Sequence, residues 1–245
     1  MRDLARANKY LGGTRSVLGE LHRAVDEFLP RSLSILDVGT GAGDMLARVR
    51  QEPRWRDVRL DTIGLDMSPV VVQAARLSGT PTLHGDARAL PFLDKTLDVV
   101  MCSQLLHHFS DDDAILVLRE MDRVARLRAI VCDLRRSRIA LAGFWAAARV
   151  MAFHRVSQHD GLVSVRRGFT PRELAGLVQL AVGSKPEVRK QFAFRLSASW
   201  APACRRRGTR ARPHLVRPAV LGRDRSRGHA LWPASRQVRE ADRSA

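Results

Sequence analysis

Residues 36–44 read Leu-Asp-Val-Gly-Thr-Gly-Ala-Gly-Asp, and this motif is the strongest indication of the fold in the sequence. It completes a short apolar run at residues 34–38, typical of a buried strand, and leads into a helical pattern at 44–50. Its three glycines permit positive φ angles and let a ligand lie close to the backbone where the helix begins. We therefore expect a strand–loop–helix unit whose turn binds a ligand.

The spacing of these glycines distinguishes between classes of ligand. A dinucleotide site has the pattern GxGxxG, whose third small residue would fall at position 44, and it holds a pyrophosphate at the helix N-terminus. Here the pattern is GxGxG and residue 44 is Asp, whose carboxylate would repel a pyrophosphate. The loop favours a ligand with positive charge and no phosphate, such as S-adenosylmethionine (SAM). The alternative is a tight turn without a ligand.

Strand-like and helix-like patterns alternate on both sides of this loop. The expected strands cover residues 34–38, 59–65, 82–84, 97–102 and 129–133, and the expected helices cover 44–50, 69–77 and 112–125. This order implies βαβ units and a parallel sheet with helices on both faces. Residues 188–200 alternate like a final pair of strands, so the sheet would end in an antiparallel hairpin at Trp200.

Two acids follow the second and third expected strands. Asp66, 23 residues after Gly43, could accept hydrogen bonds from both hydroxyls of a ribose. Asp86 could bind the exocyclic amine of adenine, with a backbone N–H as a second contact. The alternatives are that Asp66 belongs to a helix cap with Ser68 and that Asp86 lies in an ordinary polar loop.

The fourth expected strand ends in polar residues. Residues 97–109 read Leu-Asp-Val-Val-Met-Cys-Ser-Gln-Leu-Leu-His-His-Phe, and α/β sheets bind ligands at the carboxyl ends of their strands. A neutral histidine there could act as a general base near pH 7. Alternatively, His107 and His108 only bond to nearby loops at the entry to a helix.

Taken in order, the four motifs of residues 36–109, continued through 118–125, resemble those of class I SAM-dependent methyltransferases. Within this class the chain is similar to the small-molecule group that includes the ubiquinone/menaquinone-type C-methyltransferases. Segments 5–13 and 133–137 resemble a bacterial subfamily associated with type III polyketide synthases. The resemblance implies a Rossmann-like, seven-stranded, mostly parallel sheet with an antiparallel last strand, N-terminal helices and a helical cap insertion.

The same resemblance assigns roles to individual residues. SAM would be bound by the motif residues, with Asp37 at its ammonium group, Gly39, Thr40, Gly41 and Gly43 around its methionine part, Asp66 at its ribose, Met67, Asp86 and Ala87 at its adenine, and Ser103 near its sulfonium. Residues 1–30 would form a lid and residues 137–168 a substrate cap. Tyr10, Trp145 and His154 would then contact the acceptor, although core packing is an alternative for each cap residue.

Methyl transfer is an in-line displacement in which the cofactor carries the reactivity, so no metal or protein nucleophile is needed. We expect His108, and after it His107, as candidate general bases for an acceptor hydroxyl. The apolar cap residues favour a lipophilic or aromatic acceptor of phenolic, quinone or polyketide type.

The net charge of +17 is unevenly distributed. Residues 201–245 hold 12 arginines against Asp224, Glu240 and Asp242, a net of +9, and have too few apolar residues to form a core. We therefore expect a methyltransferase domain at 1–200 and an Arg-rich, disordered tail at 201–245. The tail resembles the translation of GC-rich DNA out of frame, as a frameshift near codon 200 would produce. The alternative is a genuine basic tail that binds anionic lipid or nucleic acid. The charge leaves RNA binding or modification as an alternative function, although no nucleic-acid module is visible. A non-catalytic protein with this fold is a further alternative.

Cysteine usage and hydropathy bound the remaining possibilities. Cys102, Cys132 and Cys204 show no CxxC pairing, so neither a disulfide framework nor a zinc site is expected. The longest apolar stretch, residues 139–153, is shorter than the about 20 residues of a membrane span and contains Arg149. The first residues have no signal-peptide pattern. These features predict a cytoplasmic protein.

Overall fold

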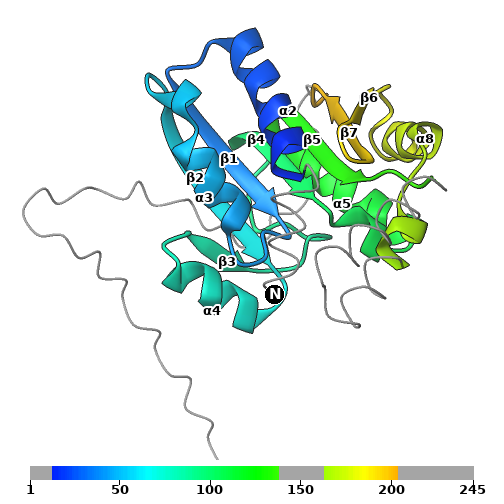
Figure 1. Ribbon diagram of the computed structural model, residues 1–245, viewed down its shortest axis with the longest axis horizontal. Coiled ribbons are helices and arrows are strands. Elements are labelled where there is room, and N and C mark those ends of the chain that lie inside the picture. The colour runs from blue at the N-terminus through cyan, green and yellow to red at the C-terminus, as the bar shows by residue number, and fades with distance from the viewer. Residues whose placement is uncertain (1–12, 138–162, 204–245) are drawn as a thin grey trace, which may run out of the picture. The chain divides into compact units, whose positions relative to one another are not determined.

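A computed structural model describes residues 13–137 and 163–203, all within one compact unit, Met1–Leu215. Seven strands form one sheet in the order β3-β2-β1-β4-β5-β7-β6 (Figure 1). The strands are β1 (Ser32–Val38), β2 (Arg59–Asp66), β3 (Thr82–His84), β4 (Leu97–Ser103), β5 (Ala125–Leu134), β6 (Glu187–Gln191) and β7 (Arg195–Trp200). The first five run parallel, whereas β7 is antiparallel to both β5 and β6. The predicted seven-stranded, mostly parallel sheet is confirmed.

Helices cover both faces of this sheet, as predicted (Figure 1). They are α2 (Gly13–Phe28), α3 (Asp44–Gln51), α4 (Pro69–Leu77), α5 (Asp111–Val124) and α8 (Pro171–Val182). Short 3-10 turns occupy Pro53–Trp55 and Leu106–His108. One hydrophobic cluster joins α2 and α3 to the sheet, and a second joins α5 and α8 to it.

The sequence pattern of β4 explains why two separate cores form. Successive side chains of a strand point to opposite faces, so Val99 and Met101 pack in the cluster with α2 and α3, while Val100 and Cys102 pack in the cluster with α5 and α8. All four are buried. A run that is apolar on both faces is characteristic of a central strand in a covered parallel sheet.

Helix starts are fixed by local side-chain caps. Ser110 caps α5 by accepting a hydrogen bond from the backbone N–H of Asp113. Thr170 and Glu173 form a capping box at the start of α8, with Pro171 in its first turn. These caps fix the beginnings of the two helices that lie beside the site.

Several predicted segments lie outside the described residues. They are the first 12 residues of the expected lid, residues 138–162 of the expected substrate cap and the Arg-rich tail from residue 204 onward. The described part of the expected lid, α2, buries Val17 and Leu21 in the core of the sheet. None of the helices within 13–137 and 163–203 combines the length and the apolar character that crossing a membrane requires.

Candidate functional site

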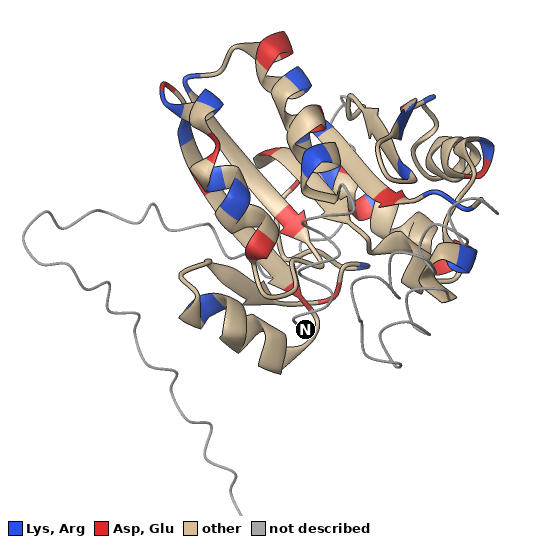
Figure 2. Cartoon of the chain, viewed as in Figure 1, with Lys and Arg blue, Asp and Glu red and all other residues tan. Residues whose placement is uncertain are grey.

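The carboxyl ends of the central strands bring the predicted motifs together at one edge of the sheet. Asp37, Asp66, Ser103 and Asp133 lie at or next to the ends of β1, β2, β4 and β5, and Figure 2 shows acidic positions along this edge. The order of the strands reverses between β1 and β4. Ligands of open α/β sheets bind in the crevice at such a reversal, so the topology places a ligand site beside the β1 loop.

The glycine-rich loop adopts the backbone that its sequence predicts. Gly39, Gly41 and Gly43 have φ angles of 72°, 59° and 83°. The N–H groups of Gly39 and Thr40 both donate to the carbonyl oxygen of Leu65, at 2.7 and 3.0 Å, and so fold the loop against β2. Gly43 is the N-cap of α3 and offers no side-chain cap. The first N–H groups of α3 are therefore available to a ligand.

We expect Gly43→Ala to lower the free energy of unfolding by about 3 kcal/mol, because a side chain there both strains a left-handed backbone and overpacks its surroundings. An added Cβ would lie 2.7 Å from the Cβ of Thr80, which is buried. Gly41→Ala is the matched control, since φ is also positive there but no atom lies within 4 Å. Gly41→Ala should lower the free energy of unfolding by only about 1 kcal/mol. Urea unfolding of both variants measures the difference, and equal losses would contradict the role of Thr80.

Asp37 is a buried carboxyl group in this loop, with 2% of the residue exposed. Burial raises its pKa to about 7; the hydrogen bond from the Thr40 hydroxyl opposes this shift, and the charge of Asp66 adds to it. The Thr40 Oγ1 donates to Oδ2 of Asp37 at 2.9 Å. A nearby cation would favour the ionised form of such a group, so Asp37 is suited to receive a positively charged ligand.

Asp66 is held by two backbone groups at the end of β2. Its Oδ2 accepts from the N–H of Gly41 and its Oδ1 from the N–H of Ser68, both at 3.0 Å. Ser68 is the N-cap of α4, so Asp66 supports that helix start as well as the glycine loop. Each carboxylate oxygen can accept a further hydrogen bond, which leaves room for a ribose diol. Met67, beside it, is 65% exposed.

The loop after β3 holds Asp86 in a fixed orientation. Arg88 donates to the Asp86 carboxylate from its backbone N–H at 2.8 Å and from its guanidinium at 2.8 to 3.2 Å. These hydrogen bonds lower the pKa of Asp86. Arg88 also pairs with Asp113 of α5, and Ala87 is buried. The sequence analysis assigned no role to Arg88. Its position, two residues after Asp86, is the one signal in the sequence that could have suggested this pairing.

Ser103 ends β4 with a hydroxyl that has no partner among the described residues. Its Oγ is buried without a hydrogen bond, although a buried hydroxyl normally has one. The next residue, Gln104, has a positive φ of 56° and donates its N–H to the carbonyl of Cys132. The strand therefore ends in a sharp turn that leaves one polar atom open to a ligand.

His107 is joined to Asp133, a residue to which the sequence analysis assigned no role. Its Nδ1 lies 2.6 Å from Oδ1 of Asp133, and its backbone N–H donates to Oδ2 at 3.3 Å. His107 is 5% exposed and Asp133 is fully buried. Asp133 lies near the carboxyl end of β5. Because ligands bind at the carboxyl ends of such strands, this position could have identified Asp133 as a candidate site residue from the sequence.

His108 lies beside this pair in a different environment. Its ring centroid is 4.1 Å from that of His107, and burial, followed by the neighbouring His107, lowers its pKa. Both histidines line a cleft of about 710 Å³ between the start of α5 and α8. The apolar walls of the cleft are formed by Phe109, Ile115, Phe169, Leu177 and Leu180.

The structure does not test every predicted contact. Tyr10, Trp145 and His154, expected at the acceptor, lie outside the described residues. Among residues 13–137 and 163–203, no group of three His, Cys, Asp or Glu side chains is arranged to hold a metal ion.

Comparisons with known proteins agree with this geometry. Residues 35–128 match the family model described as a methyltransferase domain. The demethylmenaquinone methyltransferase of Roseiflexus castenholzii (strain DSM 13941 / HLO8) is 35% identical over 103 residues, 40% of this chain and 41% of that protein. The (R,S)-reticuline 7-O-methyltransferase of Papaver somniferum is 31% identical over 136 residues, 51% of this chain and 36% of that protein. The chain thus matches less than half of the length of these relatives.

Solved structures share the fold at low sequence identity. The plantazolicin methyltransferase BamL superimposes with a TM-score of 0.60 at 16% identity, covering 76% of this chain and 68% of BamL. The magnesium protoporphyrin IX methyltransferase of Synechocystis PCC 6803 gives a TM-score of 0.53 at 15% identity, covering 79% of this chain and 84% of that one. With the matched domain at its centre, the complete seven-stranded sheet of this chain has the fold of known SAM-dependent methyltransferases.

Proposed function

We propose that this protein transfers the methyl group of SAM to a small-molecule acceptor. The observation that carries the proposal is the set of three positive-φ glycines beside Asp37 and Asp66 at the switch point of the sheet. An exposed N-terminus of α3 and two carboxylates fit a ligand with a cationic amino-acid part and a ribose.

The residues present fit SAM on three independent observations. The hydroxyl of Ser103 is buried without a partner among the described residues. The space where a side chain of Gly41 would lie is open. Burial raises the pKa of Asp37 to about 7. An adjacent ammonium group would lower this pKa again, because it stabilises the ionised carboxylate. When bound, SAM supplies an electrophilic methyl group on its sulfonium.

The residues of the chain would bind the parts of this cofactor in sequence order. Asp37 would meet the ammonium, the loop from Gly39 to Gly43 the methionine chain, and Asp66 the ribose hydroxyls. The loop at Asp86 would meet the adenine, with Met67 against the ring, and Ser103 would lie near the sulfonium. The protein thereby aligns the methyl group with the acceptor and contributes no nucleophile of its own.

The cleft beside the histidines is the proposed acceptor site. Its walls combine aromatic and aliphatic side chains with charged ones, among them Arg136, Arg167 and Glu173. The aromatic and aliphatic part favours a lipophilic or aromatic acceptor. The names of two relatives refer to demethylmenaquinone and to (R,S)-reticuline as the methylated compounds, both of which contain rings. We therefore propose a phenolic, quinone or polyketide-like acceptor.

His107 is the proposed general base for an acceptor hydroxyl. A carboxylate can only accept, so Nδ1 of His107 donates its proton to Asp133. This fixes the tautomer in which Nε2 carries a free lone pair, as a base requires. His108, which sequence reasoning placed first, has no such orienting partner among the contacts of the described residues.

Calorimetric titration of the full chain with S-adenosylhomocysteine (SAH), the demethylated cofactor, tests the proposed function. We expect saturable binding by the wild type and a loss of about tenfold or more in Asp66→Asn, because an amide cannot accept both ribose hydroxyls at full strength. Asp61→Asn is the matched control: Asp61 lies on the same strand but is exposed and faces Arg59, so its affinity should match the wild type. The absence of SAH binding at millimolar concentration would overturn the proposal.

A further inference from the structure

The segment that joins β3 to β4 carries the proposed adenine contacts. Most of the polar contacts that this segment makes with other parts of the chain are made with α5. Residues 85–96 form only short turns, and a segment of this kind would be mobile if it were left unattached. Two arginines attach it at separate points. One is Arg123, which lies on α5, and the other is Arg88, which lies on the segment itself.

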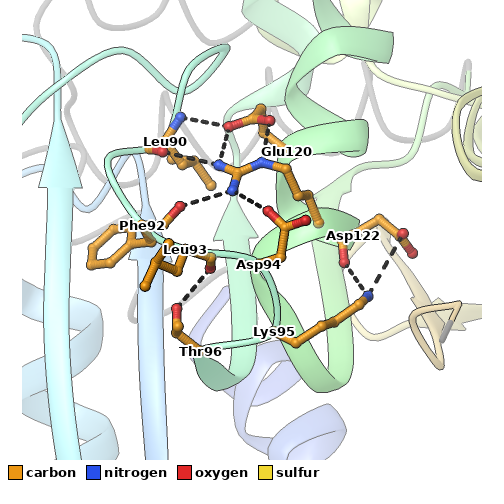
Figure 3. Close-up of polar contacts among 9 residues, drawn as sticks. Leu90, Phe92, Leu93, Asp94, Lys95, Thr96, Glu120 and Asp122 are labelled. Carbon is orange, nitrogen blue, oxygen red and sulfur yellow. Dashed lines mark hydrogen bonds and ion pairs between the residues drawn. The ribbon is translucent and has the colours of Figure 1, made fainter. Parts of the chain in front are cut away.

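The first attachment centres on Arg123, near the end of α5; Figure 3 shows its partners Leu90, Phe92, Asp94 and Glu120. Its guanidinium donates to the carbonyl oxygens of Leu90 and Phe92 at 3.0 and 2.8 Å, and to the carboxylate of Asp94 at 2.8 Å. Glu120 holds the guanidinium with two bonds of 2.6 Å and accepts the N–H of Leu90 at 2.8 Å. The planar fork of an arginine can satisfy several acceptors at once in this way, whereas a lysine cannot.

The second attachment lies at the beginning of the same helix. Arg88 bridges Asp86, within the segment, to Asp113, in the first turn of α5. Asp113 is itself fixed by the Ser110 cap, whose hydroxyl accepts its N–H at 3.2 Å. Ten residues separate Asp113 from Arg123, which corresponds to about 15 Å along a helix axis. Two points this far apart prevent the segment from pivoting on the helix.

These contacts also determine which part of Asp86 is available to a ligand. Its Oδ1 accepts the backbone N–H of Arg88 and its Oδ2 accepts Nη2, both at 2.8 Å, while the Nε hydrogen is shared between Oδ1 at 3.1 Å and Oδ2 at 3.2 Å. Three N–H groups thus meet a carboxylate that has about four acceptor sites. The Asp86 carboxylate therefore retains the capacity to accept one more donor, in a direction that Arg88 fixes.

We propose that Arg88 and Arg123 are positioning residues that hold residues 85–96 on α5, so that Asp86 meets the amino group of adenine without further ordering of the segment. The inference rests on the proposed function and deepens it, since it assigns cofactor selectivity to two residues that need not touch the cofactor. A segment ordered in advance does not lose conformational freedom when the ligand binds, and this strengthens binding.

The test compares SAH with S-inosylhomocysteine, in which a carbonyl oxygen replaces the adenine amino group. The wild type should prefer SAH, because the carboxylate of Asp86 accepts from the amine but repels the carbonyl. Arg123→Met and Arg88→Met should raise the Kd for SAH about tenfold and bring the preference close to one. Arg119→Met is the matched control: Arg119 lies on α5 but donates to the carbonyl of Ala181, so this variant should keep the preference of the wild type.

A purely structural role would lower stability without changing the preference. Titrations are therefore made well below each variant's unfolding midpoint, and Arg123→Lys provides a milder change if Arg123→Met does not fold. Amide hydrogen exchange in residues 85–96 should accelerate in the Arg123 and Arg88 variants but not in the control. An unchanged preference, or an equal loss in Arg119→Met, would overturn the inference while leaving the proposed function intact. A wild type that binds no SAH would overturn both.

Discussion

Replacement of Asp37 by Asn is expected to weaken SAH binding about 100-fold at pH 8 while making the ligand-free protein more stable. The loss of affinity follows from removing the charge that we propose to face the ligand's ammonium in a buried site, where one charge-assisted interaction contributes about 3 kcal/mol. The gain in stability follows from burial. Asp37 is 2% exposed, and no cation is recorded against it among the contacts of the described residues.

The pH dependence of this stability gain has a definite sign. Burial raises the pKa of Asp37 from 3.8 to about 7, so between these values the native state binds more protons than the unfolded chain. The stability of the ligand-free wild type therefore falls as pH rises through this window and levels off above it. The shift of about 3 pKa units corresponds to a loss on the order of 4 kcal/mol in the unfolding free energy of the wild type at pH 8. The Asn variant has no charge to bury and does not undergo this loss.

Urea unfolding and SAH titration at pH 5 and pH 8 check both parts of this prediction. Asp37→Asn should be more stable than the wild type at pH 8, with a smaller difference at pH 5. Asp98→Asn is the control, because Asp98 is equally buried but lies at the opposite end of the sheet, paired with Arg126 and Ser34. It should lose stability and keep its SAH affinity. A variant at Asp37 that is less stable at pH 8 would refute the account of this carboxyl group.

The order of the motifs made the arrangement of the proposed cofactor site predictable from sequence. Each motif follows an apolar run, and parallel strands deliver their carboxyl ends to one edge, so Asp37, Asp66 and Ser103 had to converge there. The positive φ angles of the glycines were predictable for the same reason, since no other residue adopts them at so little cost. Local pattern and sheet topology were sufficient for this half of the site.

The remaining contacts depend on side-chain directions that no periodicity encodes. His107 and Asp133 are 26 residues apart and meet because β4 and β5 are neighbours and because a 3-10 turn at Leu106–His108 rotates His107, rather than His108, toward β5. Arg123 reaches Leu90 across 33 residues. The sequence identified the polar residues at the ends of the strands. Which of the two adjacent histidines faces Asp133 depends on the orientation of the 3-10 turn, which the sequence pattern does not show.

Replacement of His107 by Gln should therefore reduce methyl transfer by 100-fold or more without changing SAH affinity by more than about twofold. Gln retains a hydrogen bond to Asp133 but cannot accept a proton, and a positioned general base contributes about 10²- to 10⁴-fold. His108→Gln is the matched variant: it alters the same cleft but leaves the His107–Asp133 pair in place, so its loss should stay below about fivefold.

The measurement is single-turnover transfer from labelled SAM to the phenol that the wild type methylates fastest. A phenol is required because an acceptor that is already ionised needs no base, and such an acceptor should show little difference between the variants. This contrast separates a base from a residue that only shapes the cleft, since a misshapen cleft would slow both acceptors alike. Equal losses in the two histidine variants, or a loss in His107→Gln that persists with the ionised acceptor, would assign His107 to packing and leave proton removal to solvent.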